Sequence, residues 1–245
     1  MKVISLNLHG HQEENEVEKL NRIVEYIKNN EIDVCLFQEV SQKIDNQYLF
    51  DNIKEDNNAY YIAKKLGYNL YYRDFKIGFD IYQEGLAIVS RYPIEEEGLH
   101  NLSKTSNYNS WLRRCALKAK INGFHFISVH LGWDCQDEKF IDQSTQLLKL
   151  ISNKTIIGGD FNFPDRTDQI NYMKKNLRSA HDIFNINSDF NPTFHFDLDS
   201  SYHSNNKMID YFFLSHDIKI SEYKIIFNTP DDYVSDHSLI YINVK

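Results

Sequence analysis

The chain has 245 residues, a formal net charge of −8 and 42% hydrophobic residues. This length and apolar content suffice for one large core, so we expect a single domain over residues 1–245. The acidic balance argues against a nucleic-acid partner, because no cluster of basic residues offsets it. A small phosphorylated substrate that is drawn in by a metal ion needs no basic surface.

The three cysteines, Cys35, Cys115 and Cys135, lack the spacing of a metal site. Cys35 and Cys115 lie inside apolar runs, so we expect reduced thiols in a reducing compartment. No apolar targeting segment precedes the first strand, and no run is long and apolar enough to span a bilayer. These features predict a cytoplasmic protein without a membrane partner, and they leave the oligomeric state open.

The first part of the chain alternates between strand and helix patterns. Residues 2–8 form a short apolar run, whereas residues 17–30 repeat apolar positions at a helical period. Residues 31–40 form an unbroken apolar strand, and the polar segment 41–66 becomes helical toward its end. Continuous apolar strands that alternate with helices predict a sheet covered on both faces.

Two further strands are predicted over residues 68–75 and 84–94. The segment 76–85 between them is interpreted as a loop, in which Asp80 and Glu84 would be solvated charges. A hairpin is predicted over 111–131, because Asn122-Gly123 is a strong turn signal. The remaining predictions are helices over 135–151 and 168–177 and strands over 154–159, 208–215, 218–228 and 238–244. The irregular segment 165–205 is expected to shape substrate choice.

The stretch Ile156–Pro164, IIGGDFNFP, combines a buried strand end with polar residues. Its two glycines let the backbone approach a neighbour closely, and Asp160 and Asn162 follow at the turn. A carboxylate there can hold a water or a metal, and an amide can hold an oxyanion. The alternative is that Asp160 and Asn162 only cap the turn.

Other strand ends carry similar polar residues: Asn7, Glu39, His130, Asp210, Asp236 and His237. Each has a structural alternative, such as turn formation by Asn7 or Asp236, or a purely structural His130. A glutamate that closes a buried strand either lies at the surface or holds a cation, and we favour the cation for Glu39. Arg113 and Arg114 are either exposed, or one of them binds a phosphate oxygen.

Together these side chains suit metal-assisted phosphoester hydrolysis. Carboxylate oxygens hold Mg²⁺, or Mn²⁺ with the same ligands, and the metal neutralises phosphoryl oxygens. Asp160 would orient and deprotonate the attacking water. His237, charged by Asp210, would supply a cation or a proton donor. The donors to the non-bridging oxygens would be Asn7, His130 and Asn162.

Six motifs, SLN, FQEV, SVHLGW, GGDFN, MIDYFFLS and SDHS, occur in the order typical of the endonuclease/exonuclease/phosphatase superfamily, which the whole chain resembles. The resemblance implies a DNase I-like α/β fold, a four-layered α/β/β/α sandwich of two packed mixed β-sheets with flanking helices. It also implies these roles: Glu39 and Asp236 as metal ligands with Asn7 close by, Asp160 and Asn162 as the water-orienting pair, His130 and His237 as phosphate contacts, and Asp210 as the partner of His237.

A narrower resemblance, to bacterial maltose 6′-phosphate phosphatases, rests on NLHGHQEEN, FDNIKEDN, KIGFDIYQEGLAIVSRYPI, HLGW and KIIFN. It implies release of phosphate from a phosphorylated disaccharide, with substrate-binding roles for Arg114, Asp80, Glu84 and Trp133, the last of which would stack on a sugar face. Met208 stands where that group has Arg, and residues 201–203 replace its Gly-Trp-Asp. These departures bear on substrate identity rather than on chemistry.

We therefore expect an Mg²⁺-dependent phosphomonoesterase that acts on a sugar phosphate by in-line attack of an Asp-activated water. The alternative enzyme is a phosphodiesterase, either an endonuclease or exonuclease or a sphingomyelinase-type lipase. We expect no exposed apolar hairpin that could enter a membrane, which argues against the lipase. A non-catalytic binding module would have lost site residues, and the core set is complete.

Overall fold

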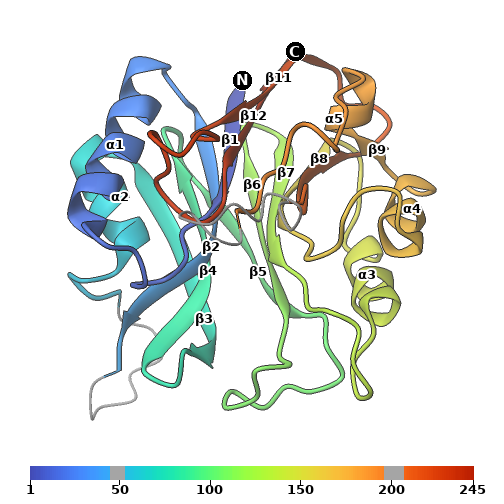
Figure 1. Ribbon diagram of the computed structural model, residues 1–245, viewed down its shortest axis with the longest axis horizontal. Helices are drawn as coiled ribbons and strands as arrows, with labels where there is room; N and C mark the ends of the chain where they lie inside the picture. Colours follow the sequence, from blue (N-terminus) through green and yellow to red (C-terminus); the bar gives the residue numbers. More distant parts are fainter. Residues whose placement is uncertain (45–52, 196–206) are drawn as a thin grey trace.

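A computed structural model describes residues 1–44, 53–195 and 207–245 of the chain. Two six-stranded sheets pack face to face between outer helices (Figure 1). The first sheet has the order β11-β12-β1-β2-β4-β3, and its strands are β1 (Lys2–Asn7), β2 (Val34–Lys43), β3 (Asn69–Gly78), β4 (Tyr82–Ser90), β11 (Ile220–Ile226) and β12 (Leu239–Val244).

The second sheet has the order β5-β6-β7-β8-β10-β9. Its strands are β5 (Glu95–Asn101), β6 (Cys115–Ile121), β7 (Phe124–His130), β8 (Thr155–Asp160), β9 (Arg178–Ser179) and β10 (Asp210–Leu214). Each sheet is mixed, because β1 runs parallel to β2 and β7 runs parallel to β8, whereas the other paired strands are antiparallel.

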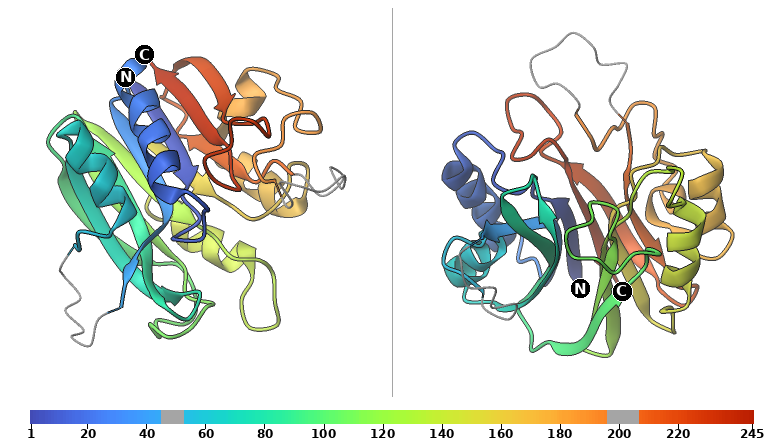
Figure 2. Two further views of the ribbon diagram at one scale, coloured as in Figure 1. Left: turned by 60° about the vertical axis from the view of Figure 1, so that its left-hand side comes forward. Right: turned by 90° about the horizontal axis from the view of Figure 1, so that it is seen from below.

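Helices form the two outer layers (Figure 2). The helices α1 (Glu16–Asn29) and α2 (Asn58–Leu66) cover the first sheet, and α3 (Phe140–Leu148) and α4 (Asp168–Lys174) cover the second. The short α5 (Ala180–Ile183) lies beside β9 and β10. The structure thus confirms the four-layered sandwich. Within the described residues, no helix has the length and apolar character needed to cross a membrane.

The two-residue period of the strands builds the core between the sheets. In β2, Val34 and Leu36 face the second sheet, whereas Cys35 and Phe37 pack toward the helices. Gly158 of β8 permits a close approach, since a Cβ atom there would lie 2.8 Å from Leu36 Cδ1. The expectation of a close backbone approach at this stretch is therefore confirmed.

The inward-facing positions become polar toward the carboxyl ends of the central strands. In β7, the inward series runs from Phe126 through Ser128 to His130, and β8 ends at Asp160 directly beside His130. Asp210 opens the antiparallel β10 opposite Asp160. Side chains from separate strands therefore meet at one end of the cleft between the sheets.

Several predicted boundaries differ from the structure. The segment 76–85 is not a loop but the tip and flanks of the β3–β4 hairpin, and β5 was not predicted. The helix expected over 135–151 spans only α3, and the strand expected from residue 111 begins at Cys115. The turn at Asn122-Gly123 is confirmed, with φ angles of 50° and 80°. The apolar pattern does not predict this hairpin, because two of its inward-facing residues, Lys76 and Glu84, are charged and form a pair.

Candidate active site

Glu39 is aimed at the site by a bulge in β2. The pairing of β2 with β4 shifts between Phe37 and Val40, and Glu39 itself has a φ of 47°. A left-handed backbone at a residue other than glycine costs on the order of 1 kcal/mol and persists where the surroundings enforce it. Glu39 Oε2 is buried and has no hydrogen-bond partner among the described residues.

Asn7, at the end of β1, connects the carboxylates of the two sheets. Its Nδ2 donates to Glu39 Oε1 at 3.0 Å and to Asp160 Oδ2 at 3.2 Å. Its Oδ1 accepts from the His9 backbone N–H at 2.9 Å. Asn7 therefore lies close to Glu39, as expected, and in this arrangement it orients both carboxylates through its amide N–H groups.

His130 stands between these carboxylates. Its Nε2 lies 3.6 Å from Asp160 Oδ2, and its Nδ1 lies 3.8 Å from Glu39 Oε1. Burial lowers the pKa of His130 well below its usual value, and the nearby Arg114 adds to this effect. A neutral imidazole at this position can donate one N–H to a ligand.

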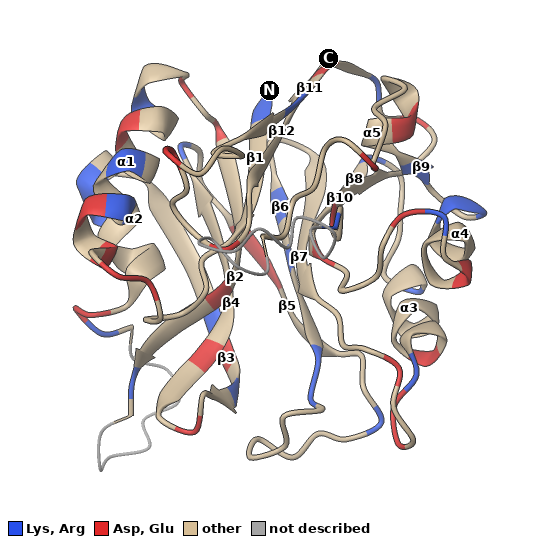
Figure 3. Ribbon diagram, viewed as in Figure 1, with Lys and Arg blue, Asp and Glu red and all other residues tan. Residues whose placement is uncertain are grey.

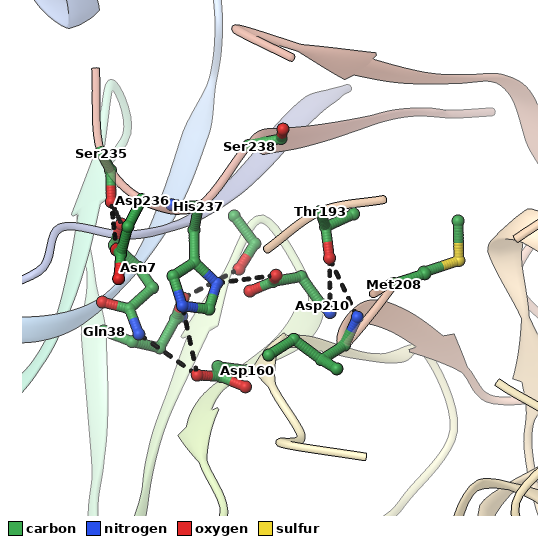
Figure 4. A network of polar contacts seen from close by, with 12 residues as sticks. Asn7, Gln38, Asp160, Thr193, Met208, Asp210, Ser235, Asp236, His237 and Ser238 are labelled. Atoms are coloured by element: carbon green, nitrogen blue, oxygen red, sulfur yellow. Dashed lines mark hydrogen bonds and ion pairs between the residues drawn. The ribbon is translucent and has the colours of Figure 1, made fainter. Parts of the chain in front are cut away.

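His237 and Asp210 form a buried pair that lies beside Asp160 (Figure 4). His237 Nδ1 lies 2.8 Å from Asp210 Oδ2, and its Nε2 lies 3.8 Å from Asp160 Oδ2. Thr193 Oγ1 accepts from the backbone N–H of Ile209 and of Asp210, at 3.0 Å each, and so anchors the start of β10. Burial opposes protonation of His237, but the charges of Asp210 and Asp236 outweigh it and raise its pKa well above the usual value.

Asp160 and Asn162 are brought together as the turn pattern predicts. The Asn162 backbone N–H donates to Asp160 Oδ1 at 2.8 Å, and its Nδ2 donates to the Leu131 carbonyl at 2.8 Å. Burial raises the pKa of Asp160 to about 7, and the charge on His237 partly offsets the rise. Asp160 therefore combines a fixed orientation with a pKa suited to accepting a proton near neutral pH.

Asp236 belongs to a neighbouring cluster with two residues that the sequence analysis left without a role, His9 and Glu13. His9 Nδ1 lies 2.8 Å from Glu13 Oε1 and 3.5 Å from Asp236 Oδ1. Glu13 Oε1 also accepts from the Asp236 backbone N–H at 3.2 Å. His9 and Glu13 sit in an irregular turn after β1, where no periodic pattern could reveal their contact.

The expected substrate residues line one cavity of about 530 Å³. Its wall also contains Glu39, His130, Asp160, Asp236 and His237. Asp80 and Trp133 are exposed at the cavity, whereas Arg114 and Glu84 are buried. The structure therefore brings the expected substrate residues and these five site residues together around one cavity. Asn7 and Asp210 do not line it.

The interpretation of Glu84 as a solvated loop charge is wrong. Glu84 pairs across the hairpin with Lys76, with 2.9 Å between Lys76 Nζ and Glu84 Oε1, and both side chains are buried. The hairpin tip exposes two apolar side chains, Phe79 and Ile81, with the charged Asp80 between them, and the expectation of no apolar hairpin that could enter a membrane stays a prediction. Lys76 lines the cavity as well, and the sequence pattern did not identify it.

The departures from the narrower family pattern leave the described site intact. Met208 is buried in the apolar layer behind the second sheet, and its side chain points away from His237 in Figure 4. Residues 201–203 lie outside the described residues, as does most of the segment 191–206.

Two groups of residues at the site offer donor atoms close enough together to hold a divalent cation. Glu39, His130 and Asp160 each offer a ligand atom within 4.8 Å of the others, as do His9, Glu13 and Asp236. The unpartnered Glu39 Oε2 in a buried position is an available oxygen ligand. The predicted ligands Glu39 and Asp236 thus belong to two adjacent groups that Asn7 and His9 connect.

The family model of the Endonuclease/Exonuclease/phosphatase family matches residues 4–237, so the chain belongs to this family of hydrolases. A family protein from Leptotrichia buccalis is similar in structure, with 26% sequence identity and a TM-score of 0.85, covering 100% of this chain and 99% of the other. No curated protein sequence matches.

More distant similarities concern the fold alone. A mannosyl-6-phosphatase from Bacteroides thetaiotaomicron has 19% identity and a TM-score of 0.70, covering 100% of this chain and 99% of its own. TDP2 from D. rerio, in complex with a single-strand DNA product, has 14% identity and a TM-score of 0.69, with 100% and 98% covered. One fold therefore serves different phosphoester substrates.

Proposed function

We propose that the protein is an Mg²⁺-dependent phosphomonoesterase that releases phosphate from a sugar phosphate resembling maltose 6′-phosphate. The observation that supports this proposal most strongly is the convergence of Asp160, His130, His237 and the unpartnered Glu39 oxygen on one cavity. Its volume of about 530 Å³ is in the range of small-ligand sites.

Glu39 and Asp236, with Asn7 beside them, would hold the metal, and Mn²⁺ would accept the same ligands. A divalent ion bound there supplies charge neutralisation for the phosphoryl and leaving oxygens. The remaining chemistry belongs to the side chains of the chain itself.

Asp160 orients the attacking water and accepts its proton, because Asn162 and Asn7 hold its two carboxylate oxygens in place. The charged His237 and the neutral His130 donate to non-bridging phosphoryl oxygens. The water oxygen bonds to phosphorus in line with the departing oxygen. The ester P–O bond breaks, the sugar oxygen takes up a proton from the solvent to become a hydroxyl, and Asp160 returns the proton of the attacking water to the solvent.

The alternative proposal is a phosphodiesterase of the endonuclease/exonuclease or sphingomyelinase type. The exposed Phe79 and Ile81 favour an apolar substrate over a nucleic acid. Figure 3 shows Lys and Arg interspersed with Asp and Glu along several elements of the chain. Together with the net charge of −8, this distribution weighs against the nuclease.

The deciding experiment measures product release with Mg²⁺, each time with an EDTA control, from four kinds of substrate. These are maltose 6′-phosphate, other sugar phosphates, nicked and duplex DNA, and sphingomyelin. We expect EDTA-sensitive phosphate release from the disaccharide phosphate. Cleavage of DNA or sphingomyelin without any phosphomonoesterase activity would overturn the proposal and favour the alternative.

A further inference from the structure

Arg114 is a buried cation that forms no ion pair with a described residue, although the carboxylates of Glu84, Glu39 and Asp160 act on its charge from a longer distance. Its side chain lines the cavity and is only 4% exposed. Its Nη1 donates to the backbone carbonyls of Trp111 and Arg113 at 3.1 and 3.3 Å, whereas its buried Nε has no partner. In the part of the chain that the structure describes, no carboxylate oxygen lies within 4.0 Å of its guanidinium nitrogens.

Such a group is a preformed anion site. A guanidinium stays protonated in proteins, so burial cannot be relieved by loss of the proton. A buried charge is strongly unfavourable unless a partner of opposite charge approaches it. The two carbonyls fix the orientation of the Arg114 plane but do not neutralise its charge.

Glycine at position 132 admits the guanidinium next to the reaction centre. A Cβ atom at Gly132 would lie 3.1 Å from Arg114 Nε, so any other residue would crowd it. Gly132 directly follows Leu131, whose carbonyl holds Asn162, and His130 precedes Leu131. Arg114 therefore lies against the segment that carries His130, a proposed phosphate contact, and that holds Asn162 in place.

Lys76 does not compete for the same anion. Its ammonium group is paired with Glu84 at 2.9 Å, and Glu84 Oε1 lies 4.0 Å from His130 Nδ1. The pair is close to neutral as a unit, so Lys76 shields an incoming phosphate from the Glu84 carboxylate. Arg114 remains the buried cation of this wall that lacks a carboxylate within ion-pair distance among the described residues.

We propose that Arg114 makes the enzyme selective for phosphate monoesters over diesters. This inference rests on the proposed phosphomonoesterase function and assigns its specificity to one residue. A monoester has a second pKa of about 6 and carries nearly two negative charges at pH 7, on three terminal oxygens. A diester carries one charge, and its second ester group replaces the third terminal oxygen. The planar Arg114 fork binds that third oxygen in a monoester.

The test compares p-nitrophenyl phosphate with methyl p-nitrophenyl phosphate, because the two substrates share one leaving group. In Arg114→Met we expect kcat/KM for the monoester to fall roughly 10- to 100-fold, the loss expected for one charge-assisted contact, with about threefold change or less for the diester. The matched control is Arg113→Met, because Arg113 does not line the cavity. This control should keep the wild-type ratio of the two kcat/KM values.

Inhibition by inorganic phosphate gives a second readout that needs no diester turnover. Its inhibition constant should rise in Arg114→Met, and Arg114→Lys, which keeps the charge but loses the fork, should fall between Arg114→Met and wild type. If circular dichroism shows that Arg114→Met does not fold, Arg114→Lys decides the question alone. Equal losses for both esters, or an unchanged inhibition constant, would overturn the role of Arg114. A wild-type enzyme that releases no phosphate from any monoester would instead refute the proposed function.

Discussion

At the scale of single residues, burial tunes the protonation of the strand-end side chains. His130 and His237 have the same side chain and both lie near Asp160 Oδ2, yet burial favours the neutral form of His130, whereas Asp210 and Asp236 favour the charged form of His237. Opposite shifts of neighbouring groups are a feature of sites that transfer protons. The difference between the two pKa values arises from their neighbours: Asp210, at 2.8 Å, and Asp236 raise the pKa of His237, whereas Arg114 and Lys76 add to the effect of burial on His130.

The variant Asp210→Asn tests this difference. Loss of the Asp210 charge removes the largest of the charges that raise the pKa of His237, so this pKa should fall. We expect kcat to decrease roughly 10²- to 10⁴-fold at pH 7, as for removal of a general acid or cationic donor. Steady-state kinetics would measure the loss, with the exposed Asp231→Asn as the control. A kcat near that of the wild type would contradict the role of the pair.

Glu39→Ala tests the assignment of the metal. If Glu39 is chiefly a ligand, its loss should weaken metal affinity, and a high Mg²⁺ concentration should restore part of the rate. Activity measured as a function of Mg²⁺ concentration would show a midpoint shifted to higher values. Asp160→Ala provides the contrast, because loss of the residue that orients the water should not be rescued by metal. A Glu39→Ala enzyme that no Mg²⁺ concentration improves would exclude a ligand role.

At the scale of secondary-structure elements, the β3–β4 hairpin carries charge into the wall of the cavity. Lys76 and Glu84 are cross-strand partners and both face inward. Gly78 makes room for the pair, since a Cβ atom there would collide with the Glu84 carboxylate. The two strands can therefore hold an ion pair at a position where a hydrophobic pattern would predict an apolar one.

Removal of one partner of this pair should lower the free energy of unfolding more than removal of both partners. Lys76→Met leaves the buried Glu84 without a partner, so the free energy of unfolding should drop by about 3–5 kcal/mol. The double variant Lys76→Met/Glu84→Gln should recover most of that loss. Urea denaturation would measure both, with Lys120→Met as the control. Lys120 and Glu95 form an exposed pair, which should contribute about 1 kcal/mol or less. Additive losses in the double variant would contradict the pairing.

At the scale of the whole molecule, the two sheets share one apolar layer. Val3 and Ile240 of the first sheet and Leu117 and Phe212 of the second belong to the same buried cluster. Exposure of this apolar layer to water would be unfavourable for either sheet alone. We therefore propose that the chain unfolds as one domain.

Calorimetry tests the single domain. We expect one transition in which the calorimetric enthalpy of unfolding equals the van't Hoff enthalpy, because the shared layer couples both sheets. The wild-type protein is sufficient for this measurement, and a metal-free sample prepared with EDTA serves as the control for ligand effects. Two resolved transitions, or a calorimetric enthalpy well above the van't Hoff value, would show that the sheets unfold separately.

The sequence by itself determined the order of most elements, the four-layered fold through its motifs, and the set of polar residues at the strand ends. These features are local: apolar periodicity identifies strands and helices, and Asn122-Gly123 specifies its own turn. Asp160 and Asn162 were predictable because they are two residues apart and share one turn.

Only the tertiary structure decided which charges are buried and which residues meet. The Lys76–Glu84 pair, the contact of His9 with Glu13 and Asp236, and the bulge at Glu39 depend on chain segments that a local pattern does not relate. The same holds for Arg114, whose buried and unpartnered Nε is a property of its surroundings rather than of its neighbours in sequence. Burial and long-range pairing set the energy of a charge, and both exist only once the sheets have packed.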